Sequence, residues 1–242
     1  MVDTAFVLAG GLGTRLSSIV SDVPKPMASV AGRPFLEHLL DYLLTQGIEH
    51  FVLCVGHMRN VIQAHFHNSY KGKSITYSFE EEPTGTGGAL SRALKDVQPN
   101  DFFLVCNGDT FFPIDTSFLV DAARGRSWAI ATFRSSDFGR YTSLSIRSDG
   151  AVRDVRGEMG HVTPGSPVAF QANSGVWIGN PREIKLPLLV SETNYSLDDY
   201  LSQSLREGAA SAIAQEFQTT FIDIGLPEDF VRAQTMQVFI GG

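Results

Sequence analysis

The sequence predicts an α/β protein with a Rossmann-like, mainly parallel central sheet flanked by helices and a small β-rich portion in its second half. In the first half, short continuous apolar runs alternate with segments whose apolar residues recur every three or four positions. Continuous apolar runs are typical of parallel strands buried on both faces, and the helical spacing is typical of the crossovers between them. Later in the chain a hairpin signal, Asp149-Gly150, replaces this alternation.

The elements of the first half follow from these runs. Residues 4–9 are nearly all apolar and end at two glycines, which predicts a buried strand. Pro34 opens the strongest helical pattern, and Gly47 is placed to end it as a C-terminal cap. The remaining elements expected there are a strand at 51–55, a helix at 59–66, a strand at 75–79, a helix at 89–97 and a strand at 102–106.

The second half is expected to contain more turns. The elements predicted there are a hairpin of residues 144–146 and 152–155, a loop at 160–167, a helix at 196–206, a strand at 221–224 and a helix from residue 227. No repeat and no linker long enough to divide the chain is found. We therefore expect a single domain over residues 1–242.

The composition excludes several classes of protein. Hydrophobic residues make up 43% of the 242 residues, which is enough for a buried core and excludes a disordered or fibrous chain. The formal net charge is −7, whereas a nucleic-acid binder relies on an excess of Lys and Arg, so no nucleic-acid partner is expected. No secretory signal and no apolar stretch of about 20 residues is seen, so we expect a cytoplasmic protein without a membrane partner. Cys54 and Cys106 lie in apolar runs and are expected to be buried thiols.

A glycine-rich turn, LAGGLGTRL at residues 8–16, follows the first strand. Its backbone N–H groups can point at phosphate oxygens, and Arg15 adds a guanidinium that suits a polyphosphate. The turn is not a dinucleotide fingerprint, because Leu16 stands where the third glycine would be, and it lacks the Gly-Lys-Ser/Thr ending of a P-loop. Without Arg15, a plain strand-to-helix turn would be an equally good interpretation.

Lys25 is flanked by Pro24 and Pro26, which stiffen the chain and limit the positions that its ammonium group samples. Taken alone, this segment would be interpreted as a solvated loop. Its interest as a candidate ligand-binding cation depends on the other motifs.

An acidic run, Glu80-Glu81-Glu82, lies between an expected strand and an expected helix. Guanine offers adjacent N–H donors on its pairing edge, and a carboxylate can accept from both. We select Glu81 and Glu82 as candidates for recognition of a base. The alternative is that all three acids are solvated and that backbone amides select the base.

Two further acids end apolar runs: Asp109 follows Asn107-Gly108, and Asp223 lies in the late strand. Each acid alone is commonly a helix cap or a turn residue. Together they could share a Mg²⁺ ion if their strands lie close, because hard oxygen ligands suit that ion.

These segments occur in the order seen in sugar-1-phosphate nucleotidylyltransferases, which the chain resembles from about residue 5 to residue 234. The motifs that carry the resemblance are GGLGTRL at 10–16, PKPM at 24–27, EPTGTGG at 82–88, NGD at 107–109, NSGVW at 173–177 and DIGLPED at 223–229. Within the family, residues 14–27 look most like the D-glycero-α-D-manno-heptose-1-phosphate guanylyltransferase branch.

The resemblance implies that a sugar phosphate oxygen attacks the α-phosphorus of a nucleoside triphosphate, GTP in this branch, with Mg²⁺ as cofactor. Two unit charges 4 Å apart repel by about 4 kcal/mol at a dielectric of about 20, so cations are needed. The resemblance implies that Arg15 holds the triphosphate, that Lys25 neutralises the reacting phosphate, and that Asp109 and Asp223 hold the metal. The implied nucleotide-binding residues are Leu8, Ala9, Gly10, Gly11, Gly13, Thr14, Arg15, Glu81, Glu82, Gly87, Asn107 and Asp109.

The acceptor side departs from the family pattern. The implied sugar-binding residues are Tyr141, Glu158, Asn173, Gly175 and Trp177. Met159 stands where relatives carry a lysine, so a cation is missing or is supplied by Arg153 or Arg156. Thr142 replaces a family glycine whose amide faces the sugar.

The resemblance also divides the chain into a nucleotide-binding half, about 1–115, and a sugar-binding half, about 116–242. It leaves open UTP, CTP or dTTP as donor with a hexose 1-phosphate, a noncatalytic nucleotide-sugar sensor, and a homo-oligomer. His65 and His67 are two residues apart and point in different directions on a helix, so we do not expect them to form a metal site. Trp128 is expected in the core.

Overall fold

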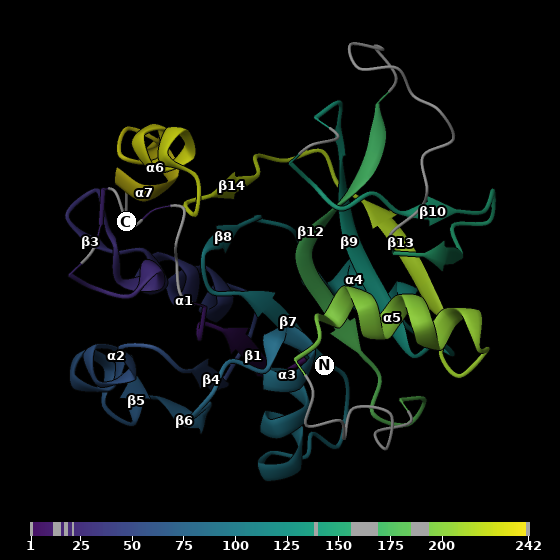
Figure 1. Cartoon of the computed structure of the whole chain (residues 1–242), viewed down its shortest axis with the longest axis horizontal. Helices are drawn as coiled ribbons and strands as arrows, with labels where there is room; N and C mark the ends of the chain where they lie inside the picture. Colours follow the sequence, from purple (N-terminus) through teal and green to yellow (C-terminus); the bar gives the residue numbers. More distant parts are fainter. Residues whose placement is uncertain are drawn as a thin grey trace.

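The computed structural model describes residues 2–11, 16, 19–20, 22–137, 140–155, 169–184 and 194–240. The strands of its central sheet are β1 (Thr4–Leu8), β4 (His50–Val55), β5 (Ser69–Tyr70), β6 (Lys73–Phe79), β7 (Phe103–Asn107), β9 (Trp128–Ser135), β12 (Phe170–Gly179) and β13 (Ala212–Glu216). Within these described ranges they form an eight-stranded sheet in the order β13-β9-β12-β7-β1-β4-β6-β5 (Figure 1).

Most neighbouring strands of the sheet are parallel. β1 pairs in parallel with β4 and β7, β4 with β6, and β9 with β13. β12 runs antiparallel to both β7 and β9, and β5 is antiparallel to β6. The expected mainly parallel sheet with flanking helices is confirmed.

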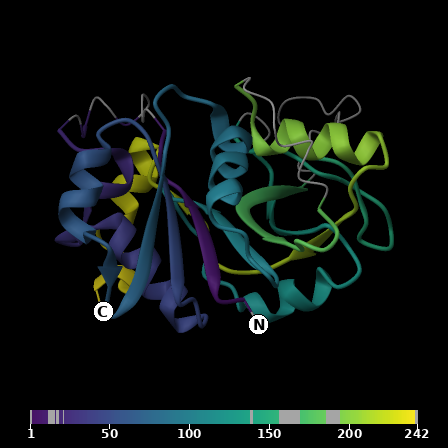
Figure 2. The same cartoon turned by 90° about the horizontal axis from the view of Figure 1, so that it is seen from below.

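Helices cover both faces of the sheet, and Figure 2 shows them on either side of the strands. One core cluster joins the sheet to α1 (Phe35–Thr45), α2 (Arg59–Phe66), α4 (Thr116–Ala122), α6 (Pro227–Ala233) and α7 (Gln237–Ile240). A second joins its other face to α3 (Gly85–Asp96) and α5 (Leu197–Arg206). Val7 enters the first cluster and its neighbour Phe6 the second, because successive side chains of a strand point to opposite faces. This is why the apolar run of β1 is continuous.

Short elements complete the fold. They are η1 (Lys25–Met27), β2 (Ser29–Val30), β3 (Arg33–Pro34), β8 (Thr110–Phe111), β10 (Ser145–Ile146), β11 (Val152–Asp154) and β14 (Ile222–Asp223). β10 and β11 form the expected hairpin around Asp149-Gly150. β14 does not join the central sheet but pairs with β8.

Most of the predicted elements are confirmed, and the ends of two helices follow the expected chemistry. Gly47 has φ +85° just beyond α1, as a C-terminal cap requires. The Ser196 hydroxyl accepts a hydrogen bond from the Asp199 N–H at 3.0 Å and caps α5. The strand expected at 221–224 is only two residues long, because a turn through Gly225 leads directly into α6. The loop expected at 160–167 lies outside the described residues.

The cysteines and tryptophans are buried. Cys54 and Cys106 are free thiols inside the sheet, as expected, and burial raises the pKa of Cys106 to about 12. Trp128 is fully buried in the core, also as expected. None of the helices in the described part of the chain is both long enough and apolar enough to cross a membrane.

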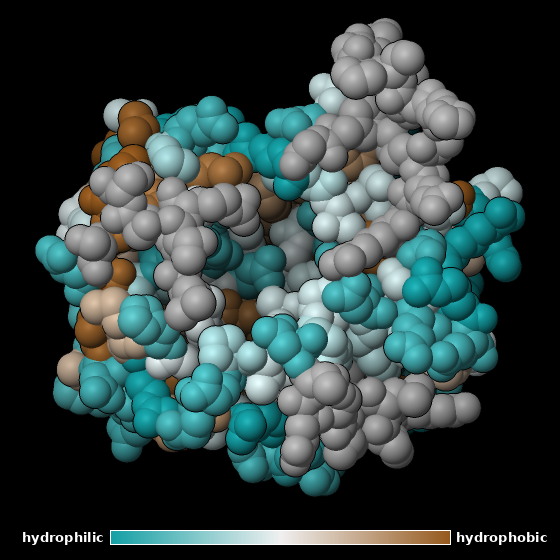
Figure 3. Space-filling view, viewed as in Figure 1, coloured by the Kyte–Doolittle hydropathy of each residue, from teal (hydrophilic) through white to brown (hydrophobic). Residues whose placement is uncertain are grey.

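The surface seen in Figure 3 is mostly hydrophilic and is hollowed near its centre. Hydrophobic residues gather at its upper left, over α6 and α7, where Val231, Val238 and Ile240 are exposed. The hollow and not this apolar patch is where the polar candidate residues are found.

Two phenylalanines provide a test of the packing. Phe103 on β7 is 1% exposed, and its ring lies edge-on to that of Phe6 with 5.3 Å between the ring centroids. Phe118 on α4 is 62% exposed. We expect Phe103→Ala to lower the free energy of unfolding by about 3–5 kcal/mol, because a buried ring leaves a cavity. Phe118→Ala should change it by no more than about 0.5 kcal/mol. Urea denaturation of both variants measures the difference, and equal losses would contradict this packing.

Candidate active site

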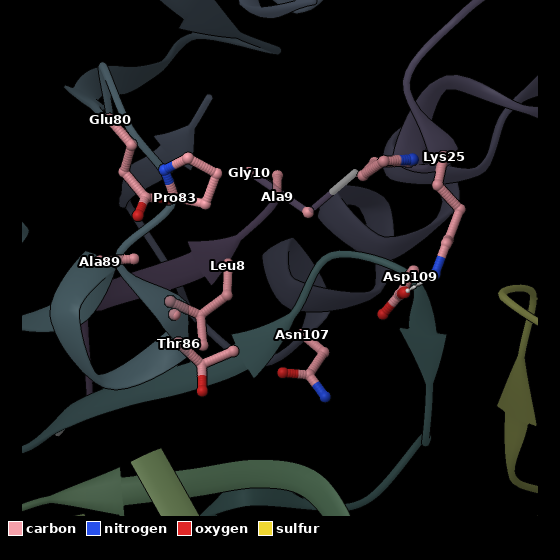
Figure 4. A pocket seen from close by; sticks show the side chains of 13 residues that line it. Leu8, Ala9, Gly10, Lys25, Glu80, Pro83, Thr86, Ala89, Asn107 and Asp109 are labelled. Carbon is pink, nitrogen blue, oxygen red and sulfur yellow. Dashed lines mark hydrogen bonds and ion pairs between the residues drawn. The ribbon is translucent and has the colours of Figure 1, made fainter. Parts of the chain in front are cut away.

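A cleft of about 260 Å³ lies at the carboxyl ends of β1 and β7 (Figure 4). Ligands commonly bind at this edge of a parallel sheet. The residues that line the cleft are Leu8, Ala9, Gly10, Gly11, Lys25, Pro26, Glu80, Pro83, Gly85, Thr86, Ala89, Asn107 and Asp109. They come from four segments that are far apart in the sequence.

The beginning of the glycine-rich turn forms one wall of the cleft. Its backbone is fixed to the neighbouring strands, since the Ala9 N–H donates to Cys54 O at 2.8 Å and the Gly108 N–H donates to Leu8 O at 2.8 Å. A Cβ atom on Gly10 would lie 2.5 Å from Glu80 Oε2, so only glycine allows that carboxylate to approach the turn. Gly13, Thr14 and Arg15 lie outside the described residues.

Lys25 and Asp109 form an ion pair in the lining of the cleft (Figure 4). Lys25 Nζ lies 2.8 Å from Asp109 Oδ2, and their side chains are 13% and 27% exposed. The single turn of η1, in which the Met27 N–H donates to Pro24 O at 2.7 Å, fixes the backbone that carries the lysine. The structure therefore brings together two residues that the sequence separates by 84 positions.

Asp223 joins this pair through the ladder of β8 and β14. Asp223 pairs with Thr110, and the Ile224 N–H donates to Asp109 O at 3.0 Å. A Cβ atom on Gly225 would lie 2.6 Å from Lys25 Nζ and 2.7 Å from Asp223 Oδ1. Lys25, which lines the cleft with Asp109, thus also lies close to the Asp223 carboxylate.

Asp109 and Asp223 fit a magnesium site. Mg²⁺ in nucleotide sites is commonly held by one or two carboxylates, and water and phosphate oxygens complete its octahedron. Within the described ranges no cluster of three or more His, Cys, Asp or Glu side chains forms a complete metal cage. Two carboxylates beside an open cleft match an ion that also binds a phosphorylated ligand.

The three acids of the acidic run lie in different places. Glu80 lines the cleft, and Glu81 lines an adjoining hollow of about 270 Å³ together with Glu80. Its Oε1 accepts from the Thr84 N–H at 3.0 Å and from the Thr84 hydroxyl at 2.5 Å, while Oε2 faces Gly10. Glu81 is exposed and pairs with Arg59 at 2.9 Å, and Glu82 is also exposed. The Glu80 N–H continues the β4–β6 ladder by donating to Val55 O at 2.9 Å, which places Glu80 at the end of the strand.

Gly87 is not among the residues that line the cleft. It is buried in α3, and its N–H donates to Tyr195 O at 3.1 Å, so this N–H does not face the cleft. A side chain on Gly87 would meet the ring of Tyr195, so this glycine allows close packing of helix and loop. Gly85 and Thr86, just before it, line the cleft.

The expected sugar-binding residues have different environments. Asn173 Nδ2 donates to Asp198 Oδ1 at 2.8 Å, and Asn173 Oδ1 accepts from the Gly175 N–H at 3.0 Å. Tyr141 is half-buried beside Phe133 and Phe221, and burial raises the pKa of its hydroxyl to about 12.

Trp177 is not among the residues that line the cleft. It is 3% exposed and packs in the core beneath α3 and α5. The register of β12 explains this position, because it sets Trp177 opposite Val105 and Ile130 inside the sheet.

The missing acceptor-side cation is not supplied by Arg153 at the cleft. Arg153 lines a separate hollow with Arg126, Arg147 and Arg206. Glu158 and Arg156, which the sequence also suggested, lie outside the described residues.

The fold and the cleft together define a nucleotide-binding α/β protein with paired carboxylates at the strand edge. A family model described as nucleotidyl transferase matches residues 4–143, more than half of the chain. The chain belongs to this family and is a nucleotidylyltransferase.

Two relatives and one solved structure are similar over nearly the whole chain. D-glycero-alpha-D-manno-heptose 1-phosphate guanylyltransferase of Campylobacter jejuni is 36% identical over 230 residues, covering 93% of this chain and 96% of its own. The protein of the same name from Aneurinibacillus thermoaerophilus is 33% identical, and the match covers 95% of this chain and 96% of the relative. The crystal structure of HddC from Yersinia pseudotuberculosis complexed with GMP-PN has a TM-score of 0.77 at 30% identity, and the match covers 96% of this chain and 98% of the HddC chain.

Gly175 tests how closely the cleft wall is packed. Gly175 has φ +75°, and a Cβ atom there would collide with the side chain of Asn107; Gly208 has φ +68° but open space around it. We expect Gly208→Ala to cost about 1 kcal/mol of unfolding free energy for the left-handed backbone alone. Gly175→Ala should cost at least about 1 kcal/mol more, because Asn107 must move. Urea denaturation compares the two variants, and equal costs would show that Asn107 does not press on Gly175.

Proposed function

We propose that this enzyme transfers a guanylyl group from GTP to D-glycero-α-D-manno-heptose 1-phosphate, giving a GDP-heptose and pyrophosphate. Sugar-1-phosphate nucleotidylyl transfer is the activity of its family relatives over the full chain length. The observation that carries the mechanism is the proximity of Lys25 to both Asp109 and Asp223. GTP and the heptose are favoured because both full-length relatives described above are named for that pair.

The reaction needs charge control more than proton transfer. A phosphate oxygen of the sugar 1-phosphate forms a bond to the α-phosphorus, and the bond from that phosphorus to the oxygen bridging to the β-phosphorus breaks. The nucleophile is already an anion, so the enzyme must bring two anions together and stabilise the developing charge. Lys25 would neutralise the reacting phosphate, and Arg15 would hold the triphosphate and the departing pyrophosphate.

Asp109 and Asp223 would hold a Mg²⁺ ion against the phosphates. When bound, the ion supplies positive charge that screens the nucleotide from the incoming phosphate. Lys25 pairs with Asp109 in this structure, so the same lysine can move between that carboxylate and a phosphate oxygen. Nucleotide binding would fall to the half before about residue 115, and the acceptor to the half after it, beside Tyr141 and Asn173.

Glu80 is the residue we now propose for base recognition. A second hollow of about 270 Å³ adjoins the cleft and shares Gly10, Glu80 and Pro83 with it. Oε1 of Glu80 accepts hydrogen bonds from the N–H and the hydroxyl of Thr84, and Oε2 lies beside Gly10 of the glycine-rich turn. Oε2 in that position can accept from guanine N1–H, whereas adenine presents an acceptor where guanine has N1–H.

The direct test is a pyrophosphate-release assay with GTP, UTP, CTP, dTTP and ATP against heptose, mannose and glucose 1-phosphates. GTP with the manno-heptose 1-phosphate should give the highest kcat/KM. A preference for UTP with glucose 1-phosphate would overturn the assignment of donor and acceptor; a relative named UTP--glucose-1-phosphate uridylyltransferase is 30% identical. No release with any pair would instead favour a noncatalytic nucleotide-sugar sensor.

Removing either metal-binding carboxylate should abolish most of the activity. We expect Asp109→Asn and Asp223→Asn each to lower turnover about 100-fold or more at saturating Mg²⁺, because a main source of charge stabilisation is lost. Asp121→Asn is the matched control, because Asp121 is exposed on α4 and pairs with Arg124. Wild-type turnover in either site variant would refute the proposed metal site.

The choice of base should depend on Glu80. With GTP and ATP competing in one assay, Glu80→Gln should lower the preference for GTP about 10- to 100-fold, because an amide that presents its NH₂ group there cannot accept from guanine N1–H. Glu82→Gln should leave the preference unchanged, since Glu82 is exposed and lines neither hollow. If Glu80→Gln retains the preference, backbone amides select the base.

A further inference from the structure

Asp229, in the first turn of α6, is a buried carboxylate with no part in the mechanism described so far. The residue is 3% exposed. It accepts hydrogen bonds from the guanidinium of Arg140 and from the backbone N–H of Asp223 at 3.3 Å, and it pairs with Arg232 at 3.0 Å. A buried carboxylate that binds the main chain of Asp223 acts directly on the position of that residue.

Arg140 connects this carboxylate to the acceptor side of the cleft. Its side chain is 19% exposed, and its guanidinium carbon lies 4.9 Å from the centre of the Tyr141 ring. It also approaches Glu228 at 3.7 Å. One planar group therefore contacts both Asp229 and the aromatic ring that we place beside the acceptor.

The turn that carries Asp223 is fixed by hydrogen bonds on several sides. Asp223 Oδ1 accepts from the Gly225 N–H at 2.8 Å, and the Ile224 N–H donates to Asp109 O at 3.0 Å. Asp229 supplies the contact at the start of this turn through the N–H of Asp223. On the other side of Asp223, the chain is held by the two-residue ladder to β8 and by the hydrogen bond from Arg232 to the main-chain oxygen of Phe221.

We propose that Arg140 and Asp229 are positioning residues that hold Asp223 in place beside Asp109, so that both carboxylates can bind one divalent cation together with the nucleotide. This inference rests on the proposed function. Arg140 neutralises Asp229, so that the buried carboxylate can bind the Asp223 backbone without adding an unpaired charge beside two other acids. Second-layer partners of this kind orient the groups that contact a metal.

Arg232 provides a matched control. It pairs with the same carboxylate at 3.0 Å, but its side chain is 54% exposed and it also donates to the main-chain oxygen of Phe221 at 2.9 Å. Arg140→Ala and Arg232→Ala therefore each remove one guanidinium from Asp229. Only the first removes the buried partner that also contacts Tyr141.

The experiment measures GTP affinity by calorimetry with and without Mg²⁺, in the absence of acceptor so that no reaction occurs. In the wild type, Mg²⁺ should strengthen GTP binding. In Arg140→Ala and Asp229→Asn, the factor by which Mg²⁺ raises the affinity for GTP should fall about 10-fold. The affinity for metal-free GTP should stay within about twofold of wild type. The Mg²⁺ concentration for half-maximal turnover should rise by a similar factor, and Arg140→Lys should recover part of the loss.

Arg232→Ala should keep the Mg²⁺-dependent gain. The inference is overturned if Arg140→Ala and Asp229→Asn keep it too, or if they weaken metal-free GTP binding equally, as a merely structural role would. Thermal unfolding shows which variants fold. If Arg140→Ala does not fold, the Asp229→Asn variant tests the inference instead, because this substitution preserves the size of the side chain. If Mg²⁺ does not strengthen GTP binding in the wild type, the proposed function fails and not only this inference.

Discussion

The active site depends on a ladder of two residue pairs between β8 and β14. It sets Asp223 opposite Thr110 and joins the Ile224 N–H to the Asp109 carbonyl at 3.0 Å. Two carboxylates from the middle and the end of the chain thereby become neighbours. Lys25 at 2.8 Å from Asp109 places a positive charge beside these two acids.

Close contact between glycines and functional side chains gives the cleft its shape. Gly10 admits the Glu80 carboxylate, Gly175 admits Asn107, and Gly225 admits Lys25 and Asp223. In each case a Cβ atom would occupy the space of a polar group that faces or borders the cleft. These three glycines therefore leave room for side chains that arrive from distant parts of the chain.

The sequence predicts the parallel core of the sheet well and the rest of the site less completely. β1, β4 and β7 are buried on both faces, so their apolar runs are continuous and easy to identify. β9, β12 and β13 were not predicted, and polar residues Asn173-Ser174 with Gly175 interrupt β12 where its pairing with β9 shifts. Three adjacent glutamates carry no sign of which one faces inward; the end of β6 decides it. The buried positions of Gly87 and Trp177 depend on packing partners far away in the chain.

In the reaction we propose, Asp109 and Asp223 act on one metal ion and not as two independent groups. The most direct measurement is the kcat/KM of the double variant Asp109→Asn, Asp223→Asn beside each single variant. Groups that act as a unit show strongly non-additive losses. The kcat/KM of the double variant should lie within about threefold of that of the less active single variant. A loss equal to the product of the two single losses would contradict a shared ion.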